Sequence, residues 1–186
     1  MTVSFDGEPE VTWGPDVWAT APDEQVGALH CVTTWSVDGL RWGGHRLAPM
    51  VAKLDRDPPP FAVVGAADAA AAVFRTEDLL ADDVMLATHL DGAPLTPRHG
   101  APLRLVSPRQ YGYKNVKHVV SVDFRTTEPA STLGPKEHLR ARVVEEERHA
   151  RLPAWAVRLP YRLTIILTAL AADRALRNKA TRTGQA

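Results

Sequence analysis

The stretch His99–His118 reads HGAPLRLVSPRQYGYKNVKH and predicts one buried strand between two cationic loops. Prolines bound the apolar run 103–107, as they often do at the ends of strands. Gly100 and Gly112 allow backbone N–H groups to come close to a ligand. The stretch therefore combines residues suited to a core with residues suited to binding.

Positive charge is concentrated here, in a chain that has 22 Lys+Arg and 22 Asp+Glu and no net charge. This balance excludes a broadly basic protein that holds nucleic acid mainly through phosphate attraction. Arginine binds phosphate through two hydrogen bonds, and lysine supplies a point charge. Two interpretations remain open: a grip on an anion or phosphate, or a solvated loop whose charges pair with Asp83, Asp91 or Glu128. The cations are Arg98, Arg104, Arg109, Lys114 and Lys117.

Cys31 is the single cysteine of the 186 residues, and it follows an apolar run. It excludes an intrachain disulfide and cysteine-rich metal centres, and it favours a reducing compartment. A free cysteine often only packs in a core, but one thiolate also suits a soft metal that brings its other ligands with it. His30 is adjacent, and neighbours on a strand point to opposite faces, so a His30–Cys31 catalytic dyad is a poor interpretation.

Short apolar runs separated by fifteen prolines and twelve glycines predict a β-rich centre, and the C-terminus is helical in pattern, which together indicate an α+β domain. Thr76 is the expected N-cap of a short helix. In the last run, positions 116, 118, 120, 122 and 124 are expected to share one face. We expect strands at 26–32, 61–64, 84–90, 103–107 and 116–124.

The main body is predicted to span residues 1–135, followed by an extension over 136–186. Residues 135–152 are charged and are either helical or a solvated excursion. Residues 163–172 (LTIILTALAA) are too short to span a bilayer. We expect a terminal helix docked on the domain or a partner subunit; the alternative is a weak membrane contact through residues 160–180. Residues 1–10 show no export signal, which predicts a cytoplasmic protein.

Four motifs, taken in order and spacing, resemble the sulfite oxidase-type molybdopterin-binding domain, and the likeness covers roughly residues 26–124. The resemblance implies an α+β fold with mixed β-sheets and short helices. It also implies a mononuclear molybdenum held by one pyranopterin dithiolene and one protein cysteine. The motifs are HCVTTWS (30–36), LDGAPL (90–95), HGAPLRLVSP (99–108) and YGYKNVKH (111–118).

By this resemblance Cys31 is the metal ligand and catalytic residue, and His99 and Arg104 contact the molybdopterin. Asp68 matches an acidic family position. The implied activity is a molybdenum-dependent oxidoreductase that transfers an oxo group on a small oxyanion or an S- or N-oxide, with an electron-transfer partner that the sequence does not identify. The alternative is a non-catalytic carrier or sensor of the cofactor. The segment expected to bind the cofactor's phosphate end is Asn115, Val116 and Lys117.

Overall fold

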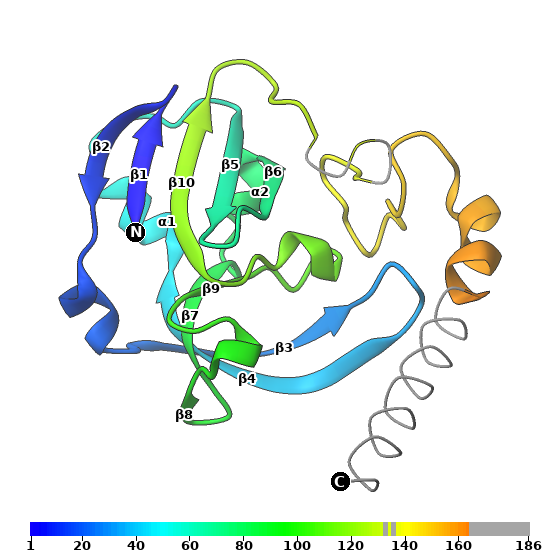
Figure 1. Cartoon of the computed structure of the whole chain (residues 1–186), viewed down its shortest axis with the longest axis horizontal. Helices are drawn as coiled ribbons and strands as arrows, with labels where there is room; N and C mark the ends of the chain where they lie inside the picture. The colour runs from blue at the N-terminus through cyan, green and yellow to red at the C-terminus, as the bar shows by residue number, and fades with distance from the viewer. Residues whose placement is uncertain (132–133, 135–136, 164–186) are drawn as a thin grey trace, which may run out of the picture.

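Alternating apolar side chains build the first of two β-sheets (Figure 1). The computed structural model describes residues 1–131, 134 and 137–163, and within them this sheet has the strand order β2–β1–β10–β5–β6. Strand β1 runs parallel to β10, whereas the other neighbouring pairs are antiparallel, so the sheet is mixed. Its strands are β1 (Thr2–Phe5), β2 (Glu8–Thr12), β5 (Phe61–Ala66), β6 (Ala71–Arg75) and β10 (Val119–Arg125).

The larger hydrophobic core lies against this sheet. The rings of Phe5 in β1 and Phe124 in β10 stack with their centroids 5.3 Å apart. Two short helices, α1 (Leu47–Ala52) and α2 (Thr76–Leu79), add buried side chains to the same core. Full burial of one such side chain stabilises the fold by roughly 1.5–3 kcal/mol, so the core supports the domain without crosslinks. The helices contribute Leu47, Val51 and Leu79.

The second sheet pairs β3 with β4, β4 with β7, and β7 with both β8 and β9. Trp42 of β4 is buried in a smaller core on this sheet. Strands β4 and β7 approach so closely that a Cβ at Gly44 would lie 2.2 Å from the carbonyl oxygen of Leu86. The strands are β3 (Asp23–His30), β4 (Ser36–Arg46), β7 (Met85–Leu90), β8 (Ala93–Pro94) and β9 (Arg104–Val106).

The loops of the second sheet hold most of the predicted site residues. The β3–β4 hairpin carries Cys31 at its tip, and in Figure 1 it extends away from the strands of the first sheet. The 3₁₀ turn η2 (Pro97–His99) precedes β9, and η3 (Gly112–Lys114) lies between β9 and β10. A further 3₁₀ turn, η1 (Pro15–Ala19), precedes β3.

The five predicted strands are confirmed as β3, β5, β7, β9 and β10, and the mixed sheets with short helices match the predicted fold class. One predicted face is wrong. His118 has φ of 54° and the pairing of β10 with β5 shifts between Val119 and Ser121, so the alternation restarts there. Val119 is consequently buried, and Val120 is 45% exposed.

The predicted N-cap is also wrong. Arg75 is the N-cap of α2 and makes no side-chain capping bond, whereas Thr76 is the first residue inside the helix. The Thr76 hydroxyl donates instead to the carbonyl of Pro59. The threonine therefore ties the helix to the proline loop before β5.

Residues 137–152 form turns and bends rather than a helix, and residues 154–163 are helical. The remainder of the predicted terminal contact, 164–180, lies outside the described residues. The boundary at residue 135 stays a prediction, although Glu137 and Ala141 beyond it are buried. Among the helices of the described residues, none has the length and apolar character needed to cross a membrane.

Candidate functional site

Cys31 is held in a tight turn at the tip of the β3–β4 hairpin. Its N–H donates to the carbonyl of Trp35 at 2.8 Å, and Thr34 N–H donates to the Cys31 carbonyl at 3.1 Å. The Thr33 hydroxyl lies 2.9 Å from the sulfur. The side chain is half-buried, so the thiol has a fixed position and remains partly exposed.

The structure brings the second motif block beside this loop. His30 and Tyr111 form an isolated parallel bridge. Gly112 lies against the hairpin, and a Cβ there would be in van der Waals contact with the carbonyl oxygen of His30, at 3.4 Å. Tyr111 is buried, and burial raises its pKa. Two segments that are far apart in the sequence, the cysteine motif and the tyrosine motif, therefore form one local structure.

Three of the five predicted cations gather around η2. Arg104 begins β9, and its Nη1 donates to the carbonyl of His99 at 3.1 Å. Lys117 Nζ donates to the carbonyl of Arg98 at 2.7 Å. Burial lowers the pKa of Lys117, and the charges of Arg104 and Arg98 lower it further. None of these three cations forms an ion pair with a described carboxylate, so the group carries uncompensated positive charge.

Arg104 is the most deeply placed of the three. It is buried beneath η2 with its guanidinium carbon 5.1 Å from the centre of the Trp42 ring, and burial lowers its pKa. Its Nε atom is buried and has no hydrogen-bond partner in the described part of the chain. A buried donor without a partner is costly, typically 1–3 kcal/mol and more for a charged group, so its retention points to a ligand.

A glycine makes the cluster compact. Gly100 has φ of +104°, and a Cβ there would lie 2.9 Å from the Cβ of Lys117. The N–H of His118 donates to the carbonyl of Gly100 at 3.2 Å. The backbone of the Lys117 segment thus lies directly against η2, an approach that other residues would obstruct.

Asn115 and Val116 are buried and stabilise the backbone of the loop between β9 and β10. The Asn115 side chain accepts from the Ser107 N–H at 2.8 Å and donates back to carbonyls of Ser107 and Tyr111. Val116 is buried, and its carbonyl accepts from Leu105 N–H at 2.8 Å. Both residues position the backbone of the predicted phosphate segment. The Asn115 side chain is already bonded within the protein.

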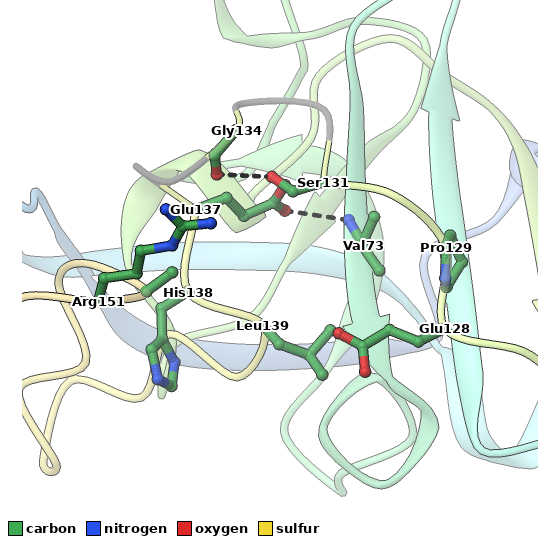
Figure 2. Close-up of a pocket in the computed structure, with 10 residues that line it drawn as sticks. Val73, Glu128, Pro129, Ser131, Gly134, Glu137, His138, Leu139 and Arg151 are labelled. Atoms are coloured by element: carbon green, nitrogen blue, oxygen red, sulfur yellow. Dashed lines mark hydrogen bonds between the residues drawn. The ribbon is translucent and has the colours of Figure 1, made fainter.

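Lys114 and Arg109 do not belong to the cation cluster. Lys114 is fully buried, and its Nζ donates to Glu137 at 2.9 Å and to the carbonyl of Val73. Figure 2 shows Glu137 reaching toward Ser131 and the backbone of Val73. Arg109 pairs with Asp83 at 2.9 Å. The sequence left two interpretations open for the five cations, an anion site or a solvated loop with paired charges. Among these cations, only Arg109 makes the predicted pair with Asp83 within the described residues.

Asp68 lies apart from these groups in the β5–β6 turn. Its side chain is exposed and accepts from the Ala70 N–H at 3.2 Å. The same turn is joined to the motif block, because Ala67 N–H donates to the carbonyl of His118 at 2.9 Å. Cofactor contact by Asp68 stays a prediction.

A cavity of about 500 Å³ lies elsewhere, between β6 and the segment after residue 127 (Figure 2). A second cavity of about 380 Å³ is lined by Arg109, Arg142 and several carboxylates. Neither is lined by Cys31 or by the cation cluster. The candidate site is the Cys31 turn together with the cation cluster, because a thiol can bind a metal and unpaired cations can bind an anion.

Two contributors escaped prediction from sequence. Trp42 lies under Arg104, and tryptophan spacing alone gave no sign of it. Arg148 donates to the carbonyl of Val32, directly after Cys31. It lies in the charged segment that was expected to form an extension, and nothing in its spacing relates it to Cys31.

The mixed fold, the cysteine turn and the cation cluster together define a molybdopterin-binding oxidoreductase domain. The chain matches the family model described as "Oxidoreductase molybdopterin binding domain" over residues 7–133, and it belongs to this family. The cofactor of this domain is accordingly molybdenum–molybdopterin.

Two proteins of related sequence and one of related structure show what the chain is similar to. The chain is 33% identical over 110 residues to the uncharacterized oxidoreductase YuiH of Bacillus subtilis (59% of this chain, 56% of that protein). It is 28% identical over 139 residues to the protein-methionine-sulfoxide reductase catalytic subunit MsrP of Gluconobacter oxydans (63% of this chain, 44% of that protein). The chain thus spans about half the length of these relatives. The sulfane dehydrogenase SoxCD of Paracoccus pantotrophus shares the fold, with TM-score 0.61 and 21% identity over 72% of this chain and 40% of that one.

The residues present fit this cofactor. Molybdopterin ends in a phosphate, and the unpartnered Nε of Arg104 lies among cations that no described carboxylate neutralises. Gly100 keeps the adjoining backbone open to close approach. A single thiolate at Cys31 matches a metal that receives its other sulfur ligands from the cofactor.

Proposed function

We propose that this protein is a molybdenum-dependent oxidoreductase that transfers an oxygen atom to or from a small oxyanion or an S- or N-oxide. The observation that carries the proposal is the cation cluster of Arg98, Arg104 and Lys117, which lacks a carboxylate partner within the described residues. When bound, the cofactor supplies two-electron redox chemistry coupled to transfer of an oxygen atom. The protein positions the cofactor and sets the electrostatic field around it.

Each group of residues has a distinct part in this proposal. Cys31 provides one thiolate to the metal, and the turn through Thr34 and Trp35 fixes its direction. Arg104 and Lys117 hold the phosphate end through charge-assisted hydrogen bonds, and His99, whose Nδ1 lies 3.1 Å from the Thr96 hydroxyl, is the neighbouring residue in η2. The described residues contain no group of three or more His, Cys, Asp or Glu that could hold a metal alone, so metal binding would depend on cofactor binding.

An S-oxide is the substrate class to test first, because the relative MsrP is named as a protein-methionine-sulfoxide reductase. Turnover would also require an electron-transfer partner. We further propose a reducing, cytoplasmic setting, since the single half-buried cysteine must remain a thiol to bind metal.

The molybdenum-to-protein ratio tests the proposal directly. Protein from a host that makes the cofactor should carry about one molybdenum per chain by elemental mass spectrometry, and Cys31→Ala should lose most of it. The matched control is Val37→Ala, an exposed position on the same hairpin. Full metal content and full activity in Cys31→Ala would refute the ligand assignment.

Redox cycling separates the enzyme from the alternative, a cofactor carrier or sensor. An oxygen-atom acceptor or donor such as dimethyl sulfoxide should change the metal's oxidation state in the loaded protein. A protein that holds molybdenum stably but never changes its oxidation state with any oxyanion, S-oxide or N-oxide would be a carrier.

A further inference from the structure

The Cys31 turn is contacted by a part of the chain that lies beyond the family match. The family model ends at residue 133, whereas Arg148 Nη1 donates to the carbonyl of Val32 at 2.6 Å. Val32 directly follows the cysteine. A charged donor on this carbonyl restrains the Val32–Thr33 peptide, the next one in the turn after Cys31, and the Thr33 hydroxyl lies 2.9 Å from the Cys31 sulfur.

The same arginine covers the residue that holds the other side of Cys31. Its guanidinium carbon lies 4.9 Å from the centre of the Tyr111 ring. Tyr111 in turn bridges His30, the residue before the cysteine. The residues on both sides of Cys31 are therefore restrained by one stacked pair, Arg148 on Tyr111.

The segment 140–148 forms a closed loop that holds Arg148 in this position. Glu147 accepts from the Arg140 side chain at 2.6 Å and from Arg142 N–H at 3.0 Å, which closes the segment on itself. The segment docks on the motif block, because Tyr111 N–H donates to the Ala141 carbonyl at 3.0 Å and Val143 N–H donates to the Arg109 carbonyl at 2.8 Å. Arg148 thus projects from an anchored loop rather than from a free chain.

Neither partner of the stack has all its polar atoms bonded. Arg148 Nε and the Tyr111 hydroxyl are both buried without a hydrogen-bond partner in the described residues. Stability alone does not favour such an arrangement, because an unsatisfied buried donor costs free energy. The pair is therefore better explained by what it does to the neighbouring turn.

We propose that Arg148 is a positioning residue that fixes the direction of the Cys31 sulfur, with the Tyr111 ring as its support. The proposal rests on the proposed role of Cys31 as the metal ligand. Arg148 acts through the Val32 carbonyl and needs no contact with substrate or cofactor. In its absence the turn opens more often, and the sulfur samples other directions.

Because Cys31 is the only cysteine, alkylation of the metal-free protein by iodoacetamide reports on this turn alone. Loss of one charge-assisted hydrogen bond should raise the rate in Arg148→Gln on the order of tenfold. Arg148→Lys, which keeps a charged donor but loses the planar stack, should lie between. The control is Arg151→Gln on the same segment, an exposed arginine that forms no ion pair within the described residues, and its rate should match the wild type.

A second measurement uses the loaded protein. At equal molybdenum content, Arg148→Gln should shift the sulfur-to-metal charge-transfer absorption, whereas Arg151→Gln should leave it unchanged. A merely structural role would lower the melting temperature without moving this band. If Arg148→Gln does not fold, Arg148→Lys carries both measurements.

The outcomes separate the two proposals. Wild-type alkylation and an unmoved band in the Arg148 variants would overturn the positioning role. If the charge-transfer band of the loaded wild-type protein is also present in loaded Cys31→Ala, the ligand assignment is overturned. The alkylation rates would still decide whether Arg148 restrains the turn.

Discussion

Replacing Lys114 by Met should destabilise the protein by roughly 3–5 kcal/mol, because it removes a buried ammonium group that lies 2.9 Å from the buried Glu137 carboxylate. The side chains of Lys114 and Glu137 are 0% and 1% exposed, so water cannot take over the interaction. The Ser131 hydroxyl at 2.8 Å and the Val73 N–H at 3.1 Å, which would stay on the carboxylate, are neutral donors. Each is worth about 1 kcal/mol, which does not offset a buried charge.

The assay is urea and thermal unfolding at neutral pH. For a chain of this size the loss corresponds to a melting temperature roughly 6–20 °C lower. The double variant Lys114→Met/Glu137→Gln should be less destabilised than Lys114→Met alone, because the amide still accepts from Val73 and carries no charge. The control is Glu24→Gln, which removes an exposed ion pair with Arg41 and should change stability by less than about 1 kcal/mol.

Acid should also reduce the stability of the unmodified protein through Glu137. Burial alone would raise the pKa of Glu137, but the charge of Lys114 and hydrogen bonds from Lys114, Ser131 and Val73 hold it below its ordinary value of 4.5. The stability from a carboxyl with a lowered pKa is complete above the unfolded value and is lost as pH falls through the folded value. A cost under about 1 kcal/mol for Lys114→Met, or a double variant less stable than the single one, would refute this reasoning.

Three further substitutions separate the cation cluster from the fold. Arg104→Met should weaken cofactor loading at limiting cofactor by roughly 1.5–3 kcal/mol while leaving the metal-free protein as stable or more so, since a buried unpaired charge is removed; equal loading would count against the phosphate contact. Gly100→Ala should also reduce loading, measured as molybdenum per chain, because its Cβ meets Lys117 and its φ is +104°. Gly44→Ala should cost roughly 4 kcal/mol or more in urea unfolding, because the added carbon overlaps the Leu86 carbonyl; a well-folded variant would contradict the close β4–β7 approach.

Local pattern was sufficient to predict the strands, since the run 103–107, for example, lies between prolines. The cysteine turn was not predicted: Cys31 was placed in the strand 26–32, whereas β3 ends at His30. Val120 was placed on the wrong face because the register shift depends on how β10 pairs with β5, which a single strand does not encode.

The site was predictable only in part, for a related reason. His99, Arg104 and Lys117 all lie in the short stretch 99–118, which the sequence already singled out. The sequence grouped Lys114 with these cations, but its side chain is buried in the core, where it is paired with Glu137, 23 residues later in the sequence. Arg148 was missed because its partners, Val32 and Tyr111, are brought to it only by the folded loop that Glu147 closes.

The parallel pairing of β1 with β10 also governs how the chain can be assembled. Synthesis proceeds from the N-terminus, and the partner of the first strand is complete only at residue 125. Until then both β1 and β5 lack the strand that lies between them, and such open edges invite pairing with other chains. The loop that carries Lys117 immediately precedes β10, so a nascent chain acquires the loop proposed to bind the cofactor and closes this sheet in the same late step.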